Sequence, residues 1–188
     1  IAMMIIRSSP QLYFDEKGNC MVDSPRFREA FTWAKKFQDT GLAGGIAAWT
    51  NEWYVGFQTG TLAYEVSGAW LGGHLKNWMA PDTAGLWGVS QWPALRKGEG
   101  KMAGGWGGSF LAIPETTKHK EEAWKFIEYA CTERAAQLKS FVAADNFPSW
   151  MPVWDDEVFD EKMDFFAGQK ARRLWIETAK SIPEVVTN

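Results

Sequence analysis

The chain has 188 residues, of which 46% are hydrophobic and 23% charged, the balance of a folded globular protein. Its formal net charge of -3 excludes the basic field that nucleic acid requires. No run of about 18 apolar residues is present that would predict a membrane span. The length suits one ordinary domain or parts of two.

Tryptophan is the compositional outlier, with 12 residues, several times its usual share. Part of this set must build a core. A flat apolar ring with a polar edge also suits the recognition of sugars, which present apolar C–H faces between hydroxyl groups. An aromatic core and a sugar-binding surface therefore both remain open from composition.

The first residues, 1–10, lack an initiator methionine and the cationic start of a signal peptide. We interpret them as the interior of a longer chain, with a buried strand that ends at Pro10. Residues 15–22 predict a polar hairpin. A helix follows from Pro25, because Ser24 is a good N-cap, Pro25 suits the first helical position and Gly41 ends the pattern. Its expected buried face comprises Phe27, Ala30, Phe31, Ala34 and Phe37.

The rest of the chain alternates between helical and extended patterns. Asn51 is expected to cap a short helix over 52–59. Short strands are expected at 61–66, 86–92 and 109–114, where β-branched and aromatic residues gather between turn residues. Helices are expected at 69–79, 115–132, 133–144, 155–163 and 167–180. One face of the helix at 115–132 is expected to carry Ala123, Phe126, Ile127, Ala130 and Cys131. Helices joined by short strands predict an α/β fold.

The motifs of enzymes and metal proteins are absent. Cys20 and Cys131 have no metal or redox spacing, and we interpret both as small buried hydrophobes, with a disulfide left open. His74 and His119 stand alone. For His119 a solvated role is favoured over catalysis. His74 follows Gly72–Gly73 and could lie near a cleft, but a structural or exposed role is favoured. No zinc, nucleophile-elbow or phosphate-loop motif is present.

The acidic residues near the aromatic segments do not form a recognisable catalytic pair. A glycosidase needs two carboxyl groups that face each other across a cleft. Glu52, Glu65 and Asp82 are explained equally well by ordinary helix and loop positions. The sequence therefore predicts no catalytic residue, no metal and no cofactor, and a binding protein rather than an enzyme.

One tryptophan, Trp106, lies between Gly104–Gly105 and Gly107–Gly108. Glycine gives the backbone unusual freedom and allows close approach to a ligand. Trp106 could fill a core at the end of a turn, or it could be a recognition platform beside an open backbone. Both readings remain open from the residues alone.

Several segments, taken in order, resemble one family. The first is a pattern of Phe57, Gly60, Ala63, Gly68 and Trp70. The second is a pattern of Gly107, Gly108, Ile113, Pro114, Thr117, Glu121 or Glu122, Ala123 and Phe126. The third is the later stretch 146–159. The chain resembles the bacterial extracellular solute-binding proteins of the sugar ABC-transporter type, the maltose-binding-protein-like group. The resemblance covers essentially all 188 residues.

The resemblance implies an α/β, periplasmic-binding-protein-like fold of type II with two lobes, present only in part. Residues 1–98 resemble part of the C-terminal lobe, 99–149 a segment of the N-terminal lobe with crossover strands, and 150–188 a return to the C-terminal lobe. The family's first N-terminal-lobe segment and its closing helices have no counterpart in these residues.

The resemblance also implies a site. Trp70 corresponds to a tryptophan that many sugar-binding members stack against a pyranose ring; the alternative is a buried tryptophan at a helix start. Ser67 and Gly68 precede it, with backbone N–H groups for ligand oxygens. The remaining candidates are Trp49 and Asn51, from a loop that borders the cleft in relatives, and Gly105 and Trp106, at the lobe crossover. Trp33, Trp124 and Trp175 lie on expected helices and are interpreted as packing residues.

The implied function is that of the substrate-binding component of an ABC importer. It would be periplasmic or on the cell surface, capture a mono- or oligosaccharide in an aromatic cleft, and deliver it to the permease transmembrane subunits. Contact with a membrane would come only through the transporter or an upstream lipid anchor. The alternatives are a carbohydrate-active enzyme with an aromatic cleft, and a protein of the same fold that binds a non-sugar solute such as a polyamine.

Overall fold

A computed structural model describes residues 1–10, 12–100, 102–105 and 107–184. The α-helices in this part of the chain are α1 Ala2–Arg7, α2 Pro25–Asp39, α3 Asn51–Gln58, α4 Trp70–His74, α5 Lys120–Thr132, α6 Arg134–Ala144 and α7 Ala171–Lys180. A π-helix, η1, continues α4 over Leu75–Met79. Short 3₁₀ turns are η2 Pro81–Thr83, η3 Met151–Val153, η4 Glu157–Asp160 and η5 Asp164–Phe166.

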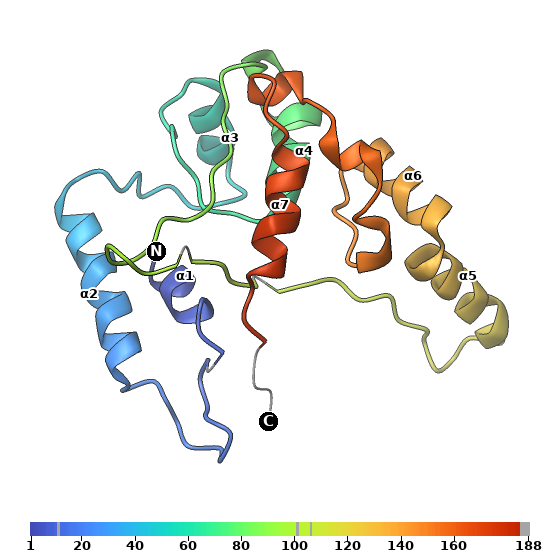
Figure 1. The fold of residues 1–188 in the computed structure, drawn as a ribbon, viewed down its shortest axis with the longest axis horizontal. Coiled ribbons are helices and arrows are strands. Elements are labelled where there is room, and N and C mark those ends of the chain that lie inside the picture. Colours follow the sequence, from blue (N-terminus) through green and yellow to red (C-terminus); the bar gives the residue numbers. More distant parts are fainter. Residues whose placement is uncertain (11, 101, 106, 185–188) are drawn as a thin grey trace.

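The helices form a broad arrangement around a central pair, α4 and α7 (Figure 1). Helices α1 and α2 lie on one side of this pair. The α5–α6 hairpin lies on the other side, at the end of a long connection without regular structure. No helix of the described residues is long and apolar enough to cross a membrane.

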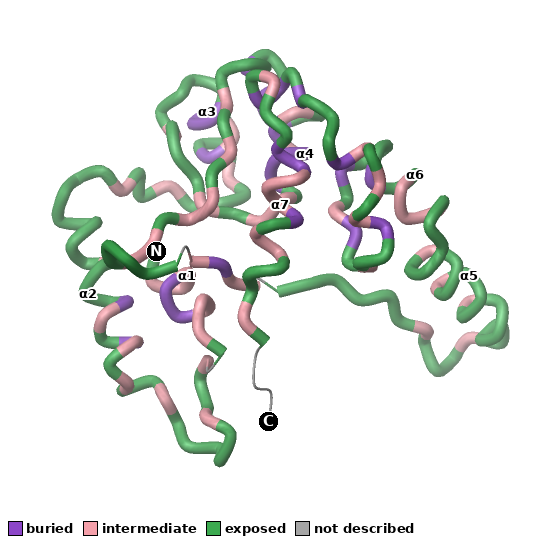
Figure 2. Tube along the Cα trace, viewed as in Figure 1, coloured by how far each residue is buried: buried purple, intermediate pink, exposed green. Residues whose placement is uncertain are grey.

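Burial is concentrated in three clusters rather than in one continuous core (Figure 2). The largest joins α3, α4, η1 and η5, with Trp53, Phe57 and Leu75 among its buried residues. The second joins α1 to α2. The third packs Phe141 of α6 against residues after position 150, including Phe159. The end of α6 therefore shares a core with the C-terminal segment.

Helix α2 confirms its predicted bounds. Ser24 is extended, Pro25 is the first helical residue, and Gly41 follows the helix in the left-handed region with φ of 71°. Its buried residues are Phe27 and Ala30, which pack on α1. The prediction of a longer apolar face was wrong, because Phe31 and Phe37 are exposed on the outer side of the helix.

The expected N-terminal strand is a helix instead, α1. Ile5 and Ile6 are buried against α2, and the Ser8 hydroxyl donates to the Ile5 carbonyl at the end of the helix. A short apolar run has no period that separates strand from helix, so its packing partner decides. Here that partner is the apolar side of α2.

The three expected strands are also not formed, and no β-strand is assigned within the described ranges. Residues 86–92 are extended, but the backbone N–H and carbonyl of Val89 bond to the side chain of Gln169 rather than to a neighbouring strand. The Gln169 amide accepts from the Val89 N–H at 2.7 Å and donates to the Val89 carbonyl at 2.8 Å. One isolated bridge, Trp92 with Met102, completes the pairing of this segment. The preference of β-branched and aromatic residues for extended backbone explains the conformation of this segment. A β-strand also needs a second extended segment beside it to complete its hydrogen bonds.

The other two extended segments differ in their surroundings. Leu62, at the start of 61–66, donates its N–H to the Gly56 carbonyl at 2.9 Å and so attaches this segment to α3. In 109–114, Phe110 and Leu111 are both exposed. The α/β class is therefore not established by these residues, which are mostly helical or irregular.

The predicted hairpin over 15–22 is present only as a turn with one isolated bridge, between Phe14 and Cys20. Asp15 orders the turn, since its carboxylate accepts from the N–H groups of Lys17 and Asn19. The interpretation of the two cysteines as buried was wrong: Cys20 and Cys131 are both exposed, and neither forms a disulfide.

Helix α5 confirms the predicted helix from Lys120 onward, but residues 115–119 are not helical and the predicted burial of the helix was wrong. None of its residues is buried, and Phe126, expected on an inner face, is exposed, as is Trp124. Within the described residues its neighbour is α6, which leaves most of its apolar side uncovered. By contrast Trp175 of α7 is a packing residue as predicted, since its ring lies against Gly72 and Phe166.

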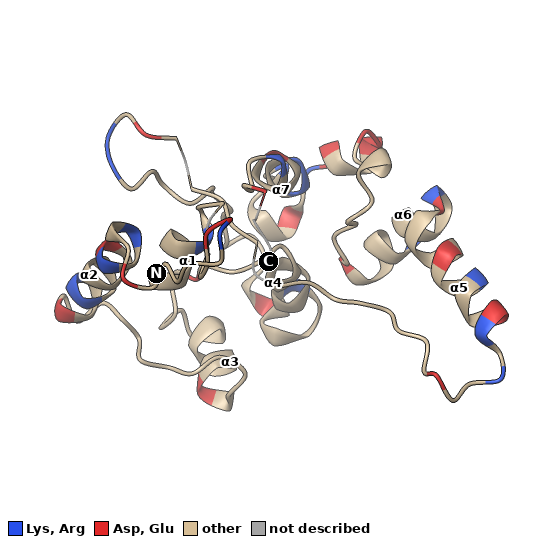
Figure 3. Ribbon diagram, turned by 90° about the horizontal axis from the view of Figure 1, so that it is seen from below, with Lys and Arg blue, Asp and Glu red and all other residues tan. Residues whose placement is uncertain are grey.

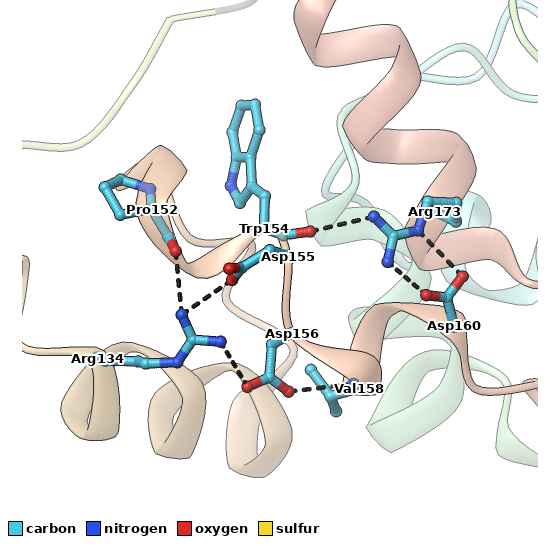
Figure 4. Close-up of polar contacts among 8 residues, drawn as sticks. All are labelled: Arg134, Pro152, Trp154, Asp155, Asp156, Val158, Asp160 and Arg173. Atoms are coloured by element: carbon cyan, nitrogen blue, oxygen red, sulfur yellow. Dashed lines mark hydrogen bonds and ion pairs between the residues drawn. The ribbon is translucent and has the colours of Figure 1, made fainter.

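The segment that was expected to be a helix over 155–163 contains a single 3₁₀ turn, Glu157–Asp160, and two arginines hold the segment in place (Figure 4). Arg134 of α6 donates to Asp155 and to Asp156, each at 2.9 Å. Arg173 of α7 pairs with Asp160 at 2.6 Å. These forked contacts connect the segment to the helix on either side.

The paired aspartates make the segment sensitive to acid. The pKa of Asp160 is lowered, chiefly because Arg173 donates to its carboxylate. The pKa of Asp156 is lowered by the Val158 N–H and then by Arg134. A carboxyl group with a lower pKa in the folded state stabilises the fold at pH values above the unfolded pKa of about 3.9, and that contribution is lost as the pH falls through the folded pKa.

We therefore expect Asp160→Asn to lower the denaturation midpoint relative to the parent at pH 7 and to lower it by less at pH 2, because the parent carboxyl takes up a proton as the pH falls through its folded pKa. Urea titrations at the two pH values measure this difference. Glu16→Gln is the matched control, since Glu16 is exposed in the hairpin turn. An equal loss at both pH values would show that the ionised carboxylate is not what stabilises the segment.

A buried ion cluster joins α6 to the central helices. Asp145, with φ of 53°, follows α6, and its carboxylate is only 2% exposed. One oxygen pairs with Lys76 and accepts from Asn77; the other lies 3.7 Å from Arg172, itself buried on α7. Arg172 also pairs with Glu161 at 2.8 Å. A Cβ at Gly73 would lie 2.5 Å from the Cβ of Asp145, so this close packing requires glycine in α4.

Candidate functional site

Trp70 is the first residue of α4, and its indole lies on the outer side of that helix. The indole is 37% exposed, whereas the next apolar residues, Leu71 and Leu75, are buried in the core. Gly68 lies against the Cδ1–Nε1 edge of the ring. A Cβ on Gly68 would be 2.8 Å from both Cδ1 and Nε1 of the indole, so only glycine allows Trp70 this position.

Trp49 stacks on Trp70. Their ring centroids are 5.3 Å apart and the rings are nearly parallel, at 18°. Trp49 is 55% exposed, and its φ of 68° is a left-handed value that is unusual for a bulky residue. Such backbone conformations cost roughly 1–3 kcal/mol and persist where the surroundings hold them in place. We call this pair the Trp49–Trp70 stack.

The stack is held from below by α3. Thr50 caps this helix through its hydroxyl, which accepts from the Trp53 N–H at 3.3 Å. Trp53 is almost fully buried, and its ring lies 5.3 Å from that of Trp49. The loop that carries Trp49 is thus anchored by the first turn of α3. Asn51, expected as the cap, is the first helical residue instead and is exposed.

A carboxylate lies beside the buried tryptophan. Partial desolvation raises the pKa of Glu65, while the indole N–H of Trp53 and the Val66 N–H, both hydrogen bonded to the carboxyl, act against that shift. Sequence analysis named Glu65 as one of three acidic residues near the aromatic segments, but its place beside Trp53 arises only through the fold. Charged side chains are otherwise sparse on α3 and α4 compared with α2 and α5 (Figure 3).

His74 and Trp78 extend the cluster along the helix. The His74 ring lies 5.9 Å from Trp49, 5.2 Å from Trp70 and 5.4 Å from Trp78. Sequence reasoning treated His74 as isolated and did not consider Trp78. The signal was present, because positions 70, 74 and 78 recur at the i, i+4 spacing that aligns side chains on one helix face.

The other predicted site residues are distributed differently. Ser67 is exposed beside Gly68, just before α4. Gly105 accepts a hydrogen bond from Arg7 at 2.8 Å, which places it beside α1. Trp106 lies outside the described residues. The structure thus brings Trp49, Trp70 and Gly68 together, and it ties Gly105 to another helix.

Two recesses lie away from the stack. One, of about 260 Å³, is lined by residues such as Arg26 and Met102 beside α1 and α2. The other, of about 410 Å³, lies between η1 and the start of α7 and is lined by Lys76, Glu161 and Arg172. Neither includes a residue of the Trp49–Trp70 stack, which is a surface feature of these residues.

The chain is similar in sequence to several sugar-binding proteins. It is 28% identical over 158 residues to an arabinooligosaccharide-binding protein of Halalkalibacterium halodurans, covering 82% of this chain and 35% of that protein. It is 23% identical over 184 residues to a lactose-binding protein of Rhizobium radiobacter, covering 97% of this chain and 43% of that protein. The chain therefore spans less than half the length of these relatives.

A solved structure shares the fold. The ABC transporter associated binding protein from B. animalis subsp. lactis Bl-04, in complex with beta-1,6-galactobiose, matches 99% of this chain with a TM-score of 0.77 and 24% sequence identity, over 47% of its own length. The described residues thus have part of a solute-binding-protein fold. The family model of the bacterial extracellular solute-binding proteins matches residues 1–137, so the chain belongs to that family.

Proposed function

We propose that the chain is part of the substrate-binding component of an ABC importer and that it binds a sugar at the Trp49–Trp70 stack. The observation that carries this proposal is the pair of parallel, exposed indoles beside a helix start, held by a buried tryptophan. Family membership and the names of the sugar-binding relatives support it.

The chemistry of the stack suits a pyranose. An indole offers a large apolar face that packs against sugar C–H groups, while the hydroxyl groups at the ring edge need polar partners. Glu65, near the same cluster, is an acceptor of the kind that a hydroxyl needs. Glu65 is exposed, so its carboxylate is open to a ligand hydroxyl at this surface.

The whole-protein parts of this function are also proposals. We propose that residues 1–98 and 150–188 belong to one lobe of the whole protein and residues 99–149 to the other. A solute that contacts both lobes would then shift the population toward a closed form. The closed form would be recognised by permease transmembrane subunits outside the cytoplasm. Asn51, Ser67, Gly105 and Trp106 remain proposed members of the site.

A thermal-shift screen of the intact protein tests the function. The panel should contain mono- and oligosaccharides of arabinose, galactose and glucose, with a polyamine and a divalent metal ion as non-sugar solutes. We expect at least one sugar to raise the melting temperature, because a ligand that binds only the folded state stabilises it. A shift with the polyamine or the metal but with no sugar would contradict the proposal, and release of monosaccharide would indicate an enzyme.

A further inference from the structure

The aromatic surface does not end at the Trp49–Trp70 stack but continues along the helix. Trp70, His74 and Trp78 form what we call the aromatic row, with successive centroids 5.2 Å and 5.4 Å apart. Its two ends lie eight positions apart, and the successive centroid distances allow at most about 11 Å between the Trp70 and Trp78 rings. That length exceeds the width of a single sugar ring.

The far end of the row is a second exposed platform. Trp78 is 52% exposed, although its neighbour Met79 is buried in the core. It belongs to the π-helix η1, a local widening that often occurs at functional sites in proteins. Tyr54 of α3 lies against it, with ring centroids 5.4 Å apart, and brings a hydroxyl that can both donate and accept. Trp78 thus repeats the combination of an exposed indole and a polar neighbour found near Trp70.

Packing alone does not account for this exposure. In the same cluster Trp53 is only 3% exposed, so the fold can bury an indole completely where burial is needed. A large aromatic ring left in water costs free energy, and contiguous exposed rings mark interaction surfaces. The row is continuous with the proposed sugar site through His74, whose ring contacts both Trp70 and Trp78.

We infer that Trp78 and Tyr54 form a second sugar subsite, which takes a further unit of an oligosaccharide whose first unit stacks at Trp70. This inference rests on the proposed function, and it assigns that function an oligosaccharide rather than a monosaccharide. We choose an oligosaccharide as the ligand because the aromatic row is continuous and longer than one sugar ring. Linked pyranose rings, each with an apolar face, can lie along such a row.

The test is a chain-length series measured by isothermal titration calorimetry on the intact protein. The ligands are the mono-, di- and trisaccharide of the sugar type that binds in the thermal-shift panel. The variants are Trp78→Ala and, as a control, Trp124→Ala; Trp124 is 57% exposed, but it lies on α5. A melting curve of each variant verifies that it is folded, and Trp78→His, which keeps a ring at the position, serves if Trp78→Ala does not fold.

We expect Trp78→Ala to weaken binding of the di- or trisaccharide roughly tenfold and to leave monosaccharide affinity unchanged, with Trp124→Ala neutral for every length. Equal losses for all lengths would overturn the second subsite, because Trp78 would then only support the first. Unchanged affinity at every length would also overturn it. If the parent binds no sugar of any length, the proposed function itself fails, which is a different result from either of these.

Discussion

Replacing Asp145 with alanine is expected to lower the free energy of unfolding by about 3–5 kcal/mol, since it removes a buried carboxylate that faces both Lys76 and the buried Arg172. The Asp145 carboxylate is 2% exposed and lies between Lys76 and Arg172. Removal of a surface carboxylate usually changes stability by less than about 1 kcal/mol. Asp155→Ala is therefore the matched control, because Asp155 pairs with Arg134 at the surface.

Two features of Asp145 can be separated by a second substitution. Asp145 has a left-handed backbone conformation, which alanine adopts less readily than aspartate or asparagine. Asp145→Asn keeps the shape and that tolerance but removes the charge. Chemical denaturation of the intact protein should rank the variants as Asp155→Ala least, Asp145→Asn intermediate and Asp145→Ala most destabilised. A loss for Asp145→Ala no larger than that for Asp155→Ala would mean that the buried cluster contributes no more than a surface pair.

Trp70→Ala is expected to weaken sugar binding roughly tenfold while the fold persists. The loss of an aromatic contact is taken as about 1–2 kcal/mol, and 1.4 kcal/mol corresponds to a factor of ten. Trp33→Ala is the control, because Trp33 has the same exposed fraction, 37%, but lies on α2. Calorimetry with the sugar that binds the parent gives the affinities. An affinity that does not change would remove Trp70 from the site.

Gly68→Ala tests the same ring without removing it. The added methyl would meet the indole at 2.8 Å, so the ring must move away from its place on the Gly68 backbone. We expect a weaker affinity than in the parent together with a changed near-ultraviolet circular dichroism spectrum from the displaced stack. Gly100→Ala is the matched glycine control, since a Cβ there would have no neighbour within 4 Å.

The sequence was most informative where local chemistry decides the structure. Ser24, Pro25 and Gly41 set the bounds of α2, because caps and breakers act over a few residues. The strands failed for the opposite reason. Val89 has an extended backbone as predicted, but its hydrogen-bond partner is the amide of Gln169, eighty positions away, and no local pattern reveals such a partner.

The same division applies to the candidate site. The family pattern around Gly68 pointed to Trp70, and the structure gives a direct reason for the glycine. It did not reveal that Trp49 would lie against Trp70, since loop conformation and a positive φ decide that contact. His74 was underestimated because a histidine was judged by its sequence neighbours, whereas the aromatic row is visible only at every fourth residue.

The two cysteines have a practical use. Both thiols are exposed and free, Cys20 beside the turn before α2 and Cys131 near the end of α5. These elements lie on opposite sides of the central helices (Figure 1). Maleimide dyes attached at the two positions would form a donor–acceptor pair for resonance energy transfer. Any movement of the α5–α6 hairpin relative to α2 on addition of a solute would change the transfer efficiency, without an engineered residue.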